Sequence, residues 1–370
     1  MDRRKFIKTA GATALSANIL PFLKFSTAEA APAGTAVVVI GQTLNSLDLH
    51  RKGTNRPSYQ ISVNCYDRLV SFGTKKMPDG SLSYDYSVLK PDLAESWETS
   101  ADGKSLIFKI RKDAVFSDGS PVTAADVKWS LDRAVSLGGF PAVQMKAGSL
   151  IKPEQFVAVD DKTFRIDLIR PSKLTLPDLA VPVPFIINSK AALKHATKDD
   201  PWATEYLHRN VAGSGAYTVA RWEPGQQLVY ERNDKWTSGP LPGVKRVILR
   251  EVPSGATRRA LIERGDVDMS FGVSDKDAKE LAEKKGVEVV ATPIENCIYC
   301  LCPNLAFEPF QDKKVRQAVA FTVPYEEIFK VAAYGKRPRR CWPRPNTRTA
   351  SRCRCPSTCR SPVGWSRRRC

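Results

Sequence analysis

The stretch LKPDLAESWETSADGKSLIFKIRKDAVFSDGSPVTAADVKWSLDRA, which spans Leu89–Ala134, decides the fold class of this chain. Its SADGK segment is a polar turn. The SLIFKI segment after that turn alternates apolar Leu106, Phe108 and Ile110 with polar neighbours, which is typical of a half-buried antiparallel strand. The first half of the stretch therefore predicts a β-hairpin.

The second half of the stretch predicts a capped helix. After the turn SDGSP, Thr123 is placed as the N-cap with Asp126 three residues later, and Gly138 is placed to close the helix. Between these ends, Val127 and Leu131 begin an apolar face at helical spacing. A hairpin joined to an amphipathic helix indicates mixed α and β structure.

Similar patterns occur on both sides of this stretch. The run GTAVVVIG, Gly34–Gly41, predicts a buried strand. The segment Pro57–Phe72 predicts an amphipathic helix, because apolar residues recur in it at steps of three and four. Two further hairpins are expected, one at 159–169 and one over Ser214–Asn233 with its turn at 223–225.

Beyond Gly243, predicted strands and helices alternate with short connections. This alternation indicates βαβ units and a parallel sheet. Two more helices, separated by Pro324, follow, and the regular pattern ends at Gly335. The fold class is therefore α/β, with a mixed α+β first lobe and the start of an α/β second lobe. The alternating elements are expected as strands at 244–252, 266–271 and 287–293 and as helices at 254–265 and 274–286.

The first thirty residues predict an export signal. A basic start, a mildly apolar run and small residues before Ala30 and Ala31 are typical of a secretory signal cleaved between those two residues. Adjacent Arg3 and Arg4 resemble the twin-arginine export motif, although a chance basic pair in a general export signal is the alternative. With either signal, we expect the body to be exported to a bacterial periplasm.

The net charge of +18 is concentrated at the two ends of the chain. Residues 336–370 carry a net charge of +12, whereas residues 31–335 carry only +3. The basic composition therefore describes the ends, and we expect no nucleic-acid partner for the body.

The cysteines leave one alternative open. Cys297, Cys300 and Cys302 have the spacing of a zinc half-site, but alternate small apolar positions of a strand explain the same pattern. We predict no metal and no cofactor. The sequence also offers no nucleophile paired with a base, since His50, His195 and His208 stand far apart, so no catalytic residue is predicted.

Five segments together resemble the large solute-binding proteins of ABC importers, family 5, of the peptide and nickel type. The resemblance runs in family order from about Ala36 to Gly335. It implies the two-lobed architecture of type II-like periplasmic binding proteins and a cleft that closes over a solute. It also implies a monomer that is not an enzyme and that delivers a peptide or other small solute to permease subunits. The segments are YDRLVSF, the Leu89–Ala134 stretch, VAGSGAYTVARWEPGQQLVYERNDKW, ATRRALIERGDVDM and FQDKKVRQAVAFTVPYEEIFKVAAYG.

The resemblance also implies the domains and the residues that contact the solute. The first lobe would span 31–252, with an inserted hairpin-and-helix subdomain at about 61–180, and the second lobe would begin at 253–335. The residues implied to face the solute lie after the first strand, at the start of the first helix, in a segment that matches the family's G-T-G, and after the last strand. They are Asn45, Ser46, Ser58, Tyr59, Gly213, Ser214, Gly215 and Asn304.

Residues 336–370 do not fit this pattern. They are rich in Arg, Pro and Cys, and we expect a disordered tail read out of frame that leaves the second lobe incomplete. Two alternatives to a working importer subunit stay open: a remnant that does not bind solute, and an adaptor that binds nucleic acid or a surface through the basic tail.

Overall fold

The computed structural model describes residues 34–77, 80–290, 301–324 and 327–328. The expected export signal with Arg3, Arg4, Ala30 and Ala31 lies outside these residues, as do the tail at 336–370 and Cys297 and Cys300. The chain divides into two units, Met1–Pro293 and Ile294–Cys370, which are described separately.

The first unit contains three sheets. A five-stranded sheet has the strand order β11-β1-β10-β9-β8, a four-stranded sheet has the order β4-β5-β7-β6, and β2 pairs with β3 in a hairpin. The strands are β1 (Thr35–Ile40), β2 (Val70–Lys76), β3 (Leu82–Pro91), β4 (Ala94–Thr99), β5 (Ser105–Ile110), β6 (Phe156–Ala158), β7 (Thr163–Asp167), β8 (Tyr217–Glu223), β9 (Gln227–Arg232), β10 (Arg246–Glu251) and β11 (Met269–Ser270).

Helices connect and cover these sheets in the first unit. The α-helices are α1 (Tyr59–Asn64), α2 (Ala124–Ser136), α3 (Phe140–Gln144), α4 (Thr175–Ala180), α5 (Ser189–Leu193), α6 (Thr204–Arg209), α7 (Gly255–Arg264) and α8 (Asp275–Ala282). Short 3₁₀ helices occur at Arg56–Ser58 and Pro153–Gln155. No helix among the described residues is long and apolar enough to cross a membrane.

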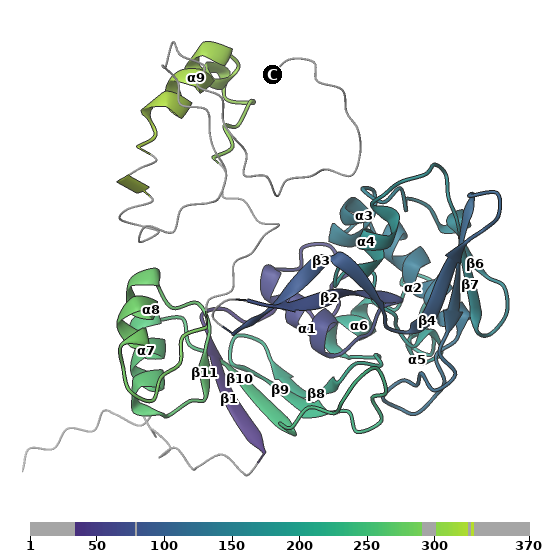
Figure 1. Ribbon diagram of the computed structural model, residues 1–370, viewed down its shortest axis with the longest axis horizontal. Helices are drawn as coiled ribbons and strands as arrows, with labels where there is room; N and C mark the ends of the chain where they lie inside the picture. Colours follow the sequence, from purple (N-terminus) through teal and green to yellow (C-terminus); the bar gives the residue numbers. More distant parts are fainter. Residues whose placement is uncertain (1–33, 78–79, 291–300, 325–326, 329–370) are drawn as a thin grey trace, which may run out of the picture. The chain divides into compact units, whose positions relative to one another are not determined.

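Strand β1 is central because both of its faces are covered. It pairs in parallel with β10 on one side and with β11 on the other. Val37 and Val39 pack with Leu261 of α7, whereas Val38 points to the opposite face and joins the core that contains Ile61 of α1. Figure 1 shows β1 with α7 and α8 on one side and α1 and α6 on the other. Burial on both faces explains the continuous apolar run that predicts this strand.

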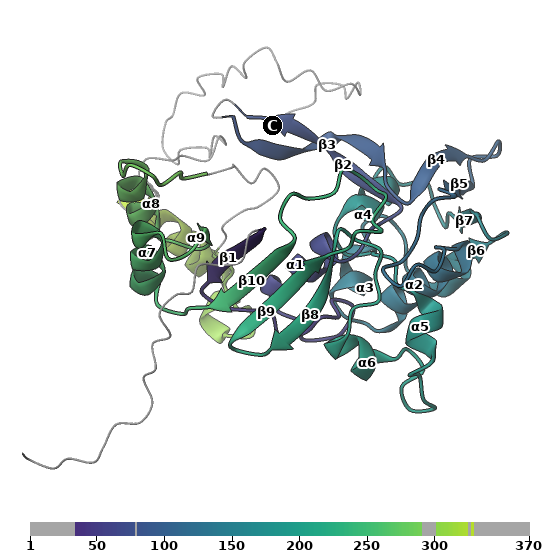
Figure 2. The same cartoon turned by 90° about the horizontal axis from the view of Figure 1, so that it is seen from below.

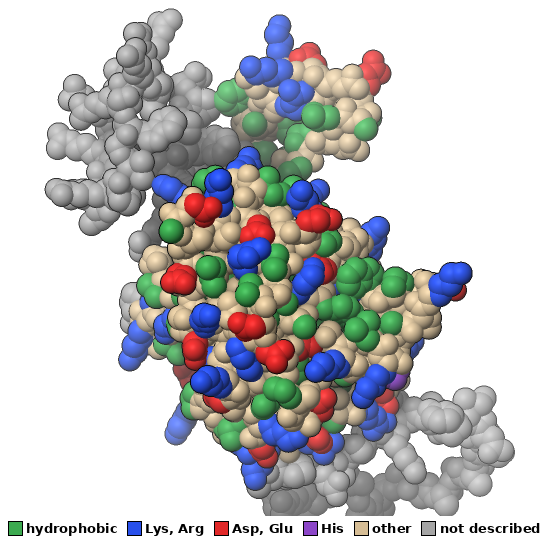
Figure 3. Space-filling view, turned by 90° about the vertical axis from the view of Figure 1, so that its right-hand side faces the viewer, with side chains coloured by type: hydrophobic (Ala, Val, Ile, Leu, Met, Phe, Trp, Pro, Cys, Tyr) green, Lys and Arg blue, Asp and Glu red, His purple; other side chains and the backbone are tan. Residues whose placement is uncertain are grey.

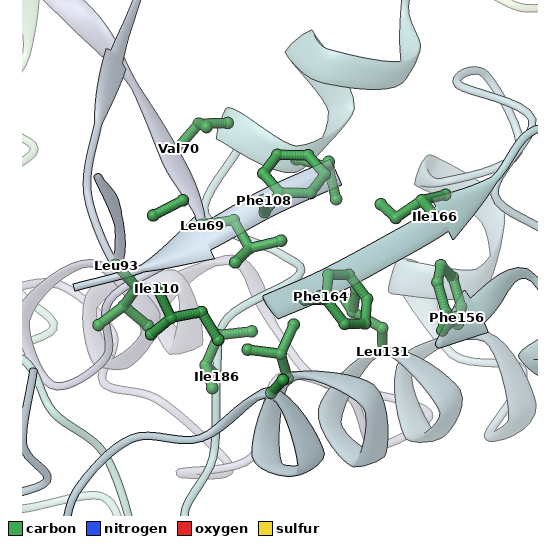
Figure 4. Close-up of a cluster of buried hydrophobic side chains, with 14 of the residues drawn as sticks. Leu69, Val70, Leu93, Phe108, Ile110, Leu131, Phe156, Phe164, Ile166 and Ile186 are labelled. Atoms are coloured by element: carbon green, nitrogen blue, oxygen red, sulfur yellow. The ribbon is translucent and has the colours of Figure 1, made fainter. Parts of the chain in front are cut away.

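A second core lies between the four-stranded sheet and α2. Phe108 of β5 and Phe164 of β7 face Leu131 of α2, and all three side chains are fully buried (Figure 4). Figure 2 shows this part of the first unit, with β4–β7 beside α2. The predicted hairpins and the helix in this region are confirmed. The helix begins with the predicted capping box, because Thr123 and Asp126 bond reciprocally through side chain and backbone.

The helix expected over Pro57–Phe72 is confirmed only at Tyr59–Asn64 and is wrong beyond it. From Cys65 onward, the backbone carbonyls accept bonds from distant segments rather than from the next helical turn. Gly215 N donates to Cys65 O at 3.0 Å, Ile186 N donates to Asp67 O at 3.0 Å, and Ala94 N donates to Leu69 O at 3.0 Å. Long-range pairing therefore ends the helix and starts a path toward β2.

The predicted hairpin over Ser214–Asn233 is also confirmed, as β8 and β9. The βαβ unit is confirmed as β10, α7 and β11, with Ser254 and Gly265 as the caps of α7. However, β11 pairs with β1, so the lobe boundary expected at 253 falls inside one sheet. The strand expected at 287–293 is absent from residues 287–290, and the rest of that segment lies outside the described residues.

The described part of the second unit contains a 3₁₀ helix, Glu308–Phe310, and α9 (Lys313–Thr322). The helix predicted before Pro324 is confirmed as α9, with Asp312 as its N-cap. No described residue of this unit is buried.

On the face of the molecule that Figure 3 shows, basic and acidic side chains are interspersed, as the near-balanced charge of the body leads us to expect.

The close packing of Gly213 on Cys65 gives a testable prediction. A Cβ on Gly213 would lie 2.0 Å from Cys65 O, so Gly213→Ala forces backbone movement, and we expect it to lower the free energy of unfolding by about 3 kcal/mol. Urea denaturation measures the change. Gly243→Ala is the matched control, because no atom lies within 4 Å of its Cβ position. Equal stability of the two variants would contradict this packing.

Candidate functional site

The parallel strands of the five-stranded sheet end at a common edge. Because β1 runs parallel to β10 and β11, Ile40, Glu251 and Ser270 lie at the carboxyl ends of neighbouring strands. Open α/β sheets bind their ligands beyond this edge. The segment at 41–55, here called the first loop, leaves β1 at this edge and is the candidate functional site.

A buried ion pair anchors the first loop. Arg133 of α2 donates to Asp48 through both terminal nitrogens, with Nη1–Oδ1 at 2.9 Å and Nη2–Oδ2 at 2.5 Å. The two side chains are only 0% and 1% exposed. Arg133 Nε also donates to Trp202 O at 3.0 Å. Because neither charge contacts solvent, each depends on the other, and the loop is fixed to α2 at Asp48.

His50 is held in the same buried region. Its Nε2 lies 3.0 Å from Val183 O, and its ring centroid lies 4.2 Å from that of Phe185. Burial, together with the charge of Arg133, lowers the pKa of His50 to about 4. The imidazole is therefore neutral at neutral pH and serves packing and hydrogen bonding.

Two asparagines close the first loop on itself. Asn55 N donates to Asn45 Oδ1 at 2.9 Å, and Asn45 Nδ2 donates to Gly53 O at 2.9 Å. Ser58 Oγ donates to Asn55 Oδ1 at 3.0 Å and is fully buried. The structure thus brings the predicted residues Asn45 and Ser58 together, with Asn45 exposed and Ser58 in a supporting position.

The other predicted residues of this region differ in exposure. Ser46 is buried and lies 3.0 Å, from Oγ to Nδ1, from His208. Tyr59 is half-buried and packs edge-on against Phe140, with ring centroids 5.7 Å apart. Burial raises the pKa of Tyr59 to about 12, so its hydroxyl stays protonated and able to donate a hydrogen bond.

Arg258 is a site-supporting residue that the sequence does not reveal. It is buried on α7 and donates from Nη1 to Val252 O at 2.7 Å and from Nη2 to Gly272 O at 2.8 Å. A Cβ on Gly41 would lie 2.9 Å from Arg258 Nη1, which explains the glycine that follows β1. This guanidinium therefore joins the segments that leave β1, β10 and β11.

The predicted segment Gly213-Ser214-Gly215 is buried away from solvent. A Cβ on Gly215 would lie 2.4 Å from the carbonyl carbon of Cys65, so only glycine allows this approach. Asn304 belongs to the second unit, is exposed, and accepts a bond from Ala306 N at 3.0 Å. Within the first unit, the structure therefore groups Asn45 and Ser46 of the first loop with Ser58.

A pocket of about 220 Å³ opens between the first loop and α6. It combines hydroxyl, amide, guanidinium and imidazole groups, with no carboxylate among its described residues. Its lining residues are Asn45, Ser46, Arg51, Lys52, Gly53, Thr54 and His208.

The described residues contain no group of three or more His, Cys, Asp or Glu side chains arranged to hold a metal ion. His195 stacks on Tyr206 with ring centroids 3.8 Å apart, while His50 and His208 have the separate partners given above. In the part of the chain that the structure covers, each histidine is accounted for by packing or hydrogen bonding.

Comparison with known proteins gives a family match. The model of the bacterial extracellular solute-binding proteins, family 5 (middle region), matches residues 88–340. The probable D,D-dipeptide-binding periplasmic protein DdpA of Escherichia coli K12 is 30% identical over 291 residues, which cover 78% of this chain and 53% of that protein. The glutathione-binding protein GsiB of Pectobacterium atrosepticum is 28% identical over 302 residues, 81% of this chain and 54% of that protein. The chain spans about half the length of these curated relatives.

Solved structures show the same fold. The binding protein AgaA of A. tumefaciens R10, in complex with agropinic acid, is 26% identical with a TM-score of 0.62, over 81% of this chain and 56% of that one. The binding protein DppA of Helicobacter pylori, in complex with the peptide STSA, is 21% identical with a TM-score of 0.63, over 81% of this chain and 58% of that one. The predicted type II-like periplasmic binding protein fold is therefore confirmed over about 80% of the chain.

The lowered pKa of His50 predicts a pH dependence of stability. The folded pKa of about 4 lies below the ordinary value of 6.5, so the unfolded chain binds the extra proton first as pH falls. The contribution of neutral His50 is present above pH 6.5 and is lost toward pH 4, by about 2 kcal/mol between pH 7 and pH 4.5.

The comparison with His50→Asn isolates this effect. Burial raises the pKa of Asp92 to about 7, which gives stability the opposite pH dependence. The stability of the wild type alone therefore shows the sum of the His50 and Asp92 effects. Urea denaturation at both pH values should show the stability difference between wild type and His50→Asn falling by about 2 kcal/mol at the lower pH. A constant difference would mean that His50 is not buried as a neutral group.

Proposed function

Because the chain belongs to the bacterial extracellular solute-binding proteins of family 5, we propose that it is the exported solute-binding component of an ABC importer. Proteins of this family bind solutes for transport and are not enzymes. The name of DdpA places that relative in the periplasm, and the basic and apolar start of this chain supports the same compartment. Delivery of the bound solute to permease subunits is part of the proposal.

We infer a di- or oligopeptide, or a related small acid, as the solute. The relatives are named for a D,D-dipeptide and for glutathione, and the solved structures hold agropinic acid and a peptide. Sites for extended peptides act largely through main-chain hydrogen bonds, with a few polar groups that fix the ends. The first loop offers such groups on a rigid support at the carboxyl edge of β1.

The family match over 88–340 is the observation that carries this proposal. Solute would act by favouring a closed form, in which the two lobes contact it together, over an open form. Asn45 and Tyr59 are proposed to contact the solute, because both keep exposed surface at the edge of the sheet. Ser46, Ser58 and the segment at 213–215 are proposed to support these contacts, since all are buried.

A second candidate function is favoured by the second unit. Several large apolar side chains are exposed there, including Leu301 at 72%, Phe307 at 56% and Phe321 at 65%. Exposed apolar surface of this kind lowers solubility unless another segment covers it. The alternative is therefore a chain that folds its first unit but does not retain solute.

A thermal-shift titration with small peptides separates the two functions. If the chain binds, trialanine at 100 times its dissociation constant should add about 2.7 kcal/mol to the free energy of unfolding and raise the melting temperature in a saturable way. Free alanine and glucose are the control solutes. A folded sample whose melting temperature no peptide of a dipeptide-to-pentapeptide panel changes would contradict the importer role and favour the second candidate.

A further inference from the structure

The pocket between the first loop and α6 lies at the same edge of the sheet as the end of β1. His208 lines it, and its ring centroid lies 5.7 Å from that of Trp222 near the end of β8. Trp222 pairs with Leu228, which in turn pairs with Leu249 near the end of β10. The pocket therefore opens where a solute held at the carboxyl ends of β1 and β10 would reach it.

Arg51 is the main charged group of the pocket. Its side chain is 34% exposed, and Nη2 lies 3.2 Å from Oε1 of Glu205, whose side chain is 74% exposed. A pair this exposed contributes little to stability and exchanges readily. Arg51 Nη1 is buried and has no hydrogen-bond partner among the described residues. The guanidinium therefore keeps one nitrogen, Nη1, without a hydrogen-bond partner in the described part of the chain, while Nη2 already pairs with one carboxylate.

The surroundings of Arg51 favour an anion. Lys52 lines the same pocket and adds a second positive charge. The buried carboxylate of Asp48 is neutralised by Arg133. The hydroxyl group of Thr54 supplies a further hydrogen-bond donor at the wall, whereas Ser46 Oγ already donates to Asp48 O at 3.2 Å. A guanidinium with a neighbouring hydroxyl matches a carboxylate in shape as well as in charge.

The pKa of His208 depends on the charges around the pocket. Burial lowers its pKa, and the charges of Arg51 and Arg209 add to this effect, while Glu205 and Asp48 oppose it. An anion bound beside Arg51 would favour the protonated ring and raise the pKa of His208. Its Nδ1 lies 3.0 Å from Ser46 Oγ, so the ring is held at the wall of the pocket and reports on it.

We propose that this pocket binds a carboxylate group of the solute, with Arg51 as its principal partner and Glu205 as an internal competitor. The assignment rests on the proposed function, and it narrows the solute class to molecules that carry a free carboxylate. It makes Arg51 a specificity-determining residue of the first unit. In the absence of solute, Glu205 forms an ion pair with the Arg51 guanidinium. The carboxylate of the bound solute displaces Glu205 from this pair.

The test compares trialanine with trialanine amide, which lacks the terminal carboxylate. Calorimetry on the full chain should show wild type binding the acid about tenfold more tightly than the amide, as expected for one partly exposed charge-assisted contact. Arg51→Gln should reduce this ratio to about one, and Glu205→Gln should increase it. Arg209→Gln is the matched control, because it removes the same charge beside His208 from a residue that does not line the pocket.

Equal acid-to-amide ratios in wild type and Arg51→Gln, or equal losses in Arg51→Gln and Arg209→Gln, would overturn the assignment. If neither peptide binds wild type, the peptide panel described above decides the proposed function, and sodium acetate tests the pocket by itself. NMR titration of His208 should then show its midpoint raised by acetate in wild type but not in Arg51→Gln. No change in the wild-type midpoint would overturn the assignment, whereas peptide binding without a carboxylate preference would leave the proposed function intact.

Discussion

The buried pair of Arg133 and Asp48 is the interaction on which the rest of the candidate site depends. It joins α2, which packs on the four-stranded sheet, to the first loop, which leaves the five-stranded sheet. Removing one partner of such a pair leaves an uncompensated buried charge and costs about 3–5 kcal/mol. The cost of breaking the pair holds the first loop in one conformation, so that Asn45 and Arg51 have fixed positions.

The two cores of the first unit are connected by backbone packing as well as by this pair. Tyr66 belongs to the core beneath the five-stranded sheet, whereas Val70, four residues later, belongs to the core of the four-stranded sheet. The chain crosses between them outside any helix or strand, and Gly213 and Gly215 pack at the start of the crossing, on Cys65 and Tyr66. The segment at 213–215 thus acts on the site indirectly, by fixing where α1 ends.

Local patterns predicted much of this fold, and long-range contacts account for the rest. The hairpin at β4 and β5 and the capping box of Thr123 depend on residues near each other in sequence, so the sequence alone reveals them. The end of α1 depends on hydrogen-bond partners more than 20 residues away in sequence, and the hydrophobic periodicity of the segment does not reveal them. In the site, Asn45 and Ser46 came from the family resemblance. Arg258 and the pairing of Arg133 with Asp48 became visible only in three dimensions, because no spacing rule links those positions.

Hydrogen exchange of the first-loop amides tests the central claim most directly. The amides of Asp48 and His50 are hydrogen-bonded within the anchored loop, and the amide of Leu47 donates to His208 O of α6 at 3.0 Å. In Arg133→Met, their protection should fall more than that of Phe108 in β5, while Arg165→Met, which breaks an exposed pair, should leave both unchanged. Unchanged protection of the loop in Arg133→Met, or an equal fall at Phe108, would contradict the claim that this pair fixes the site.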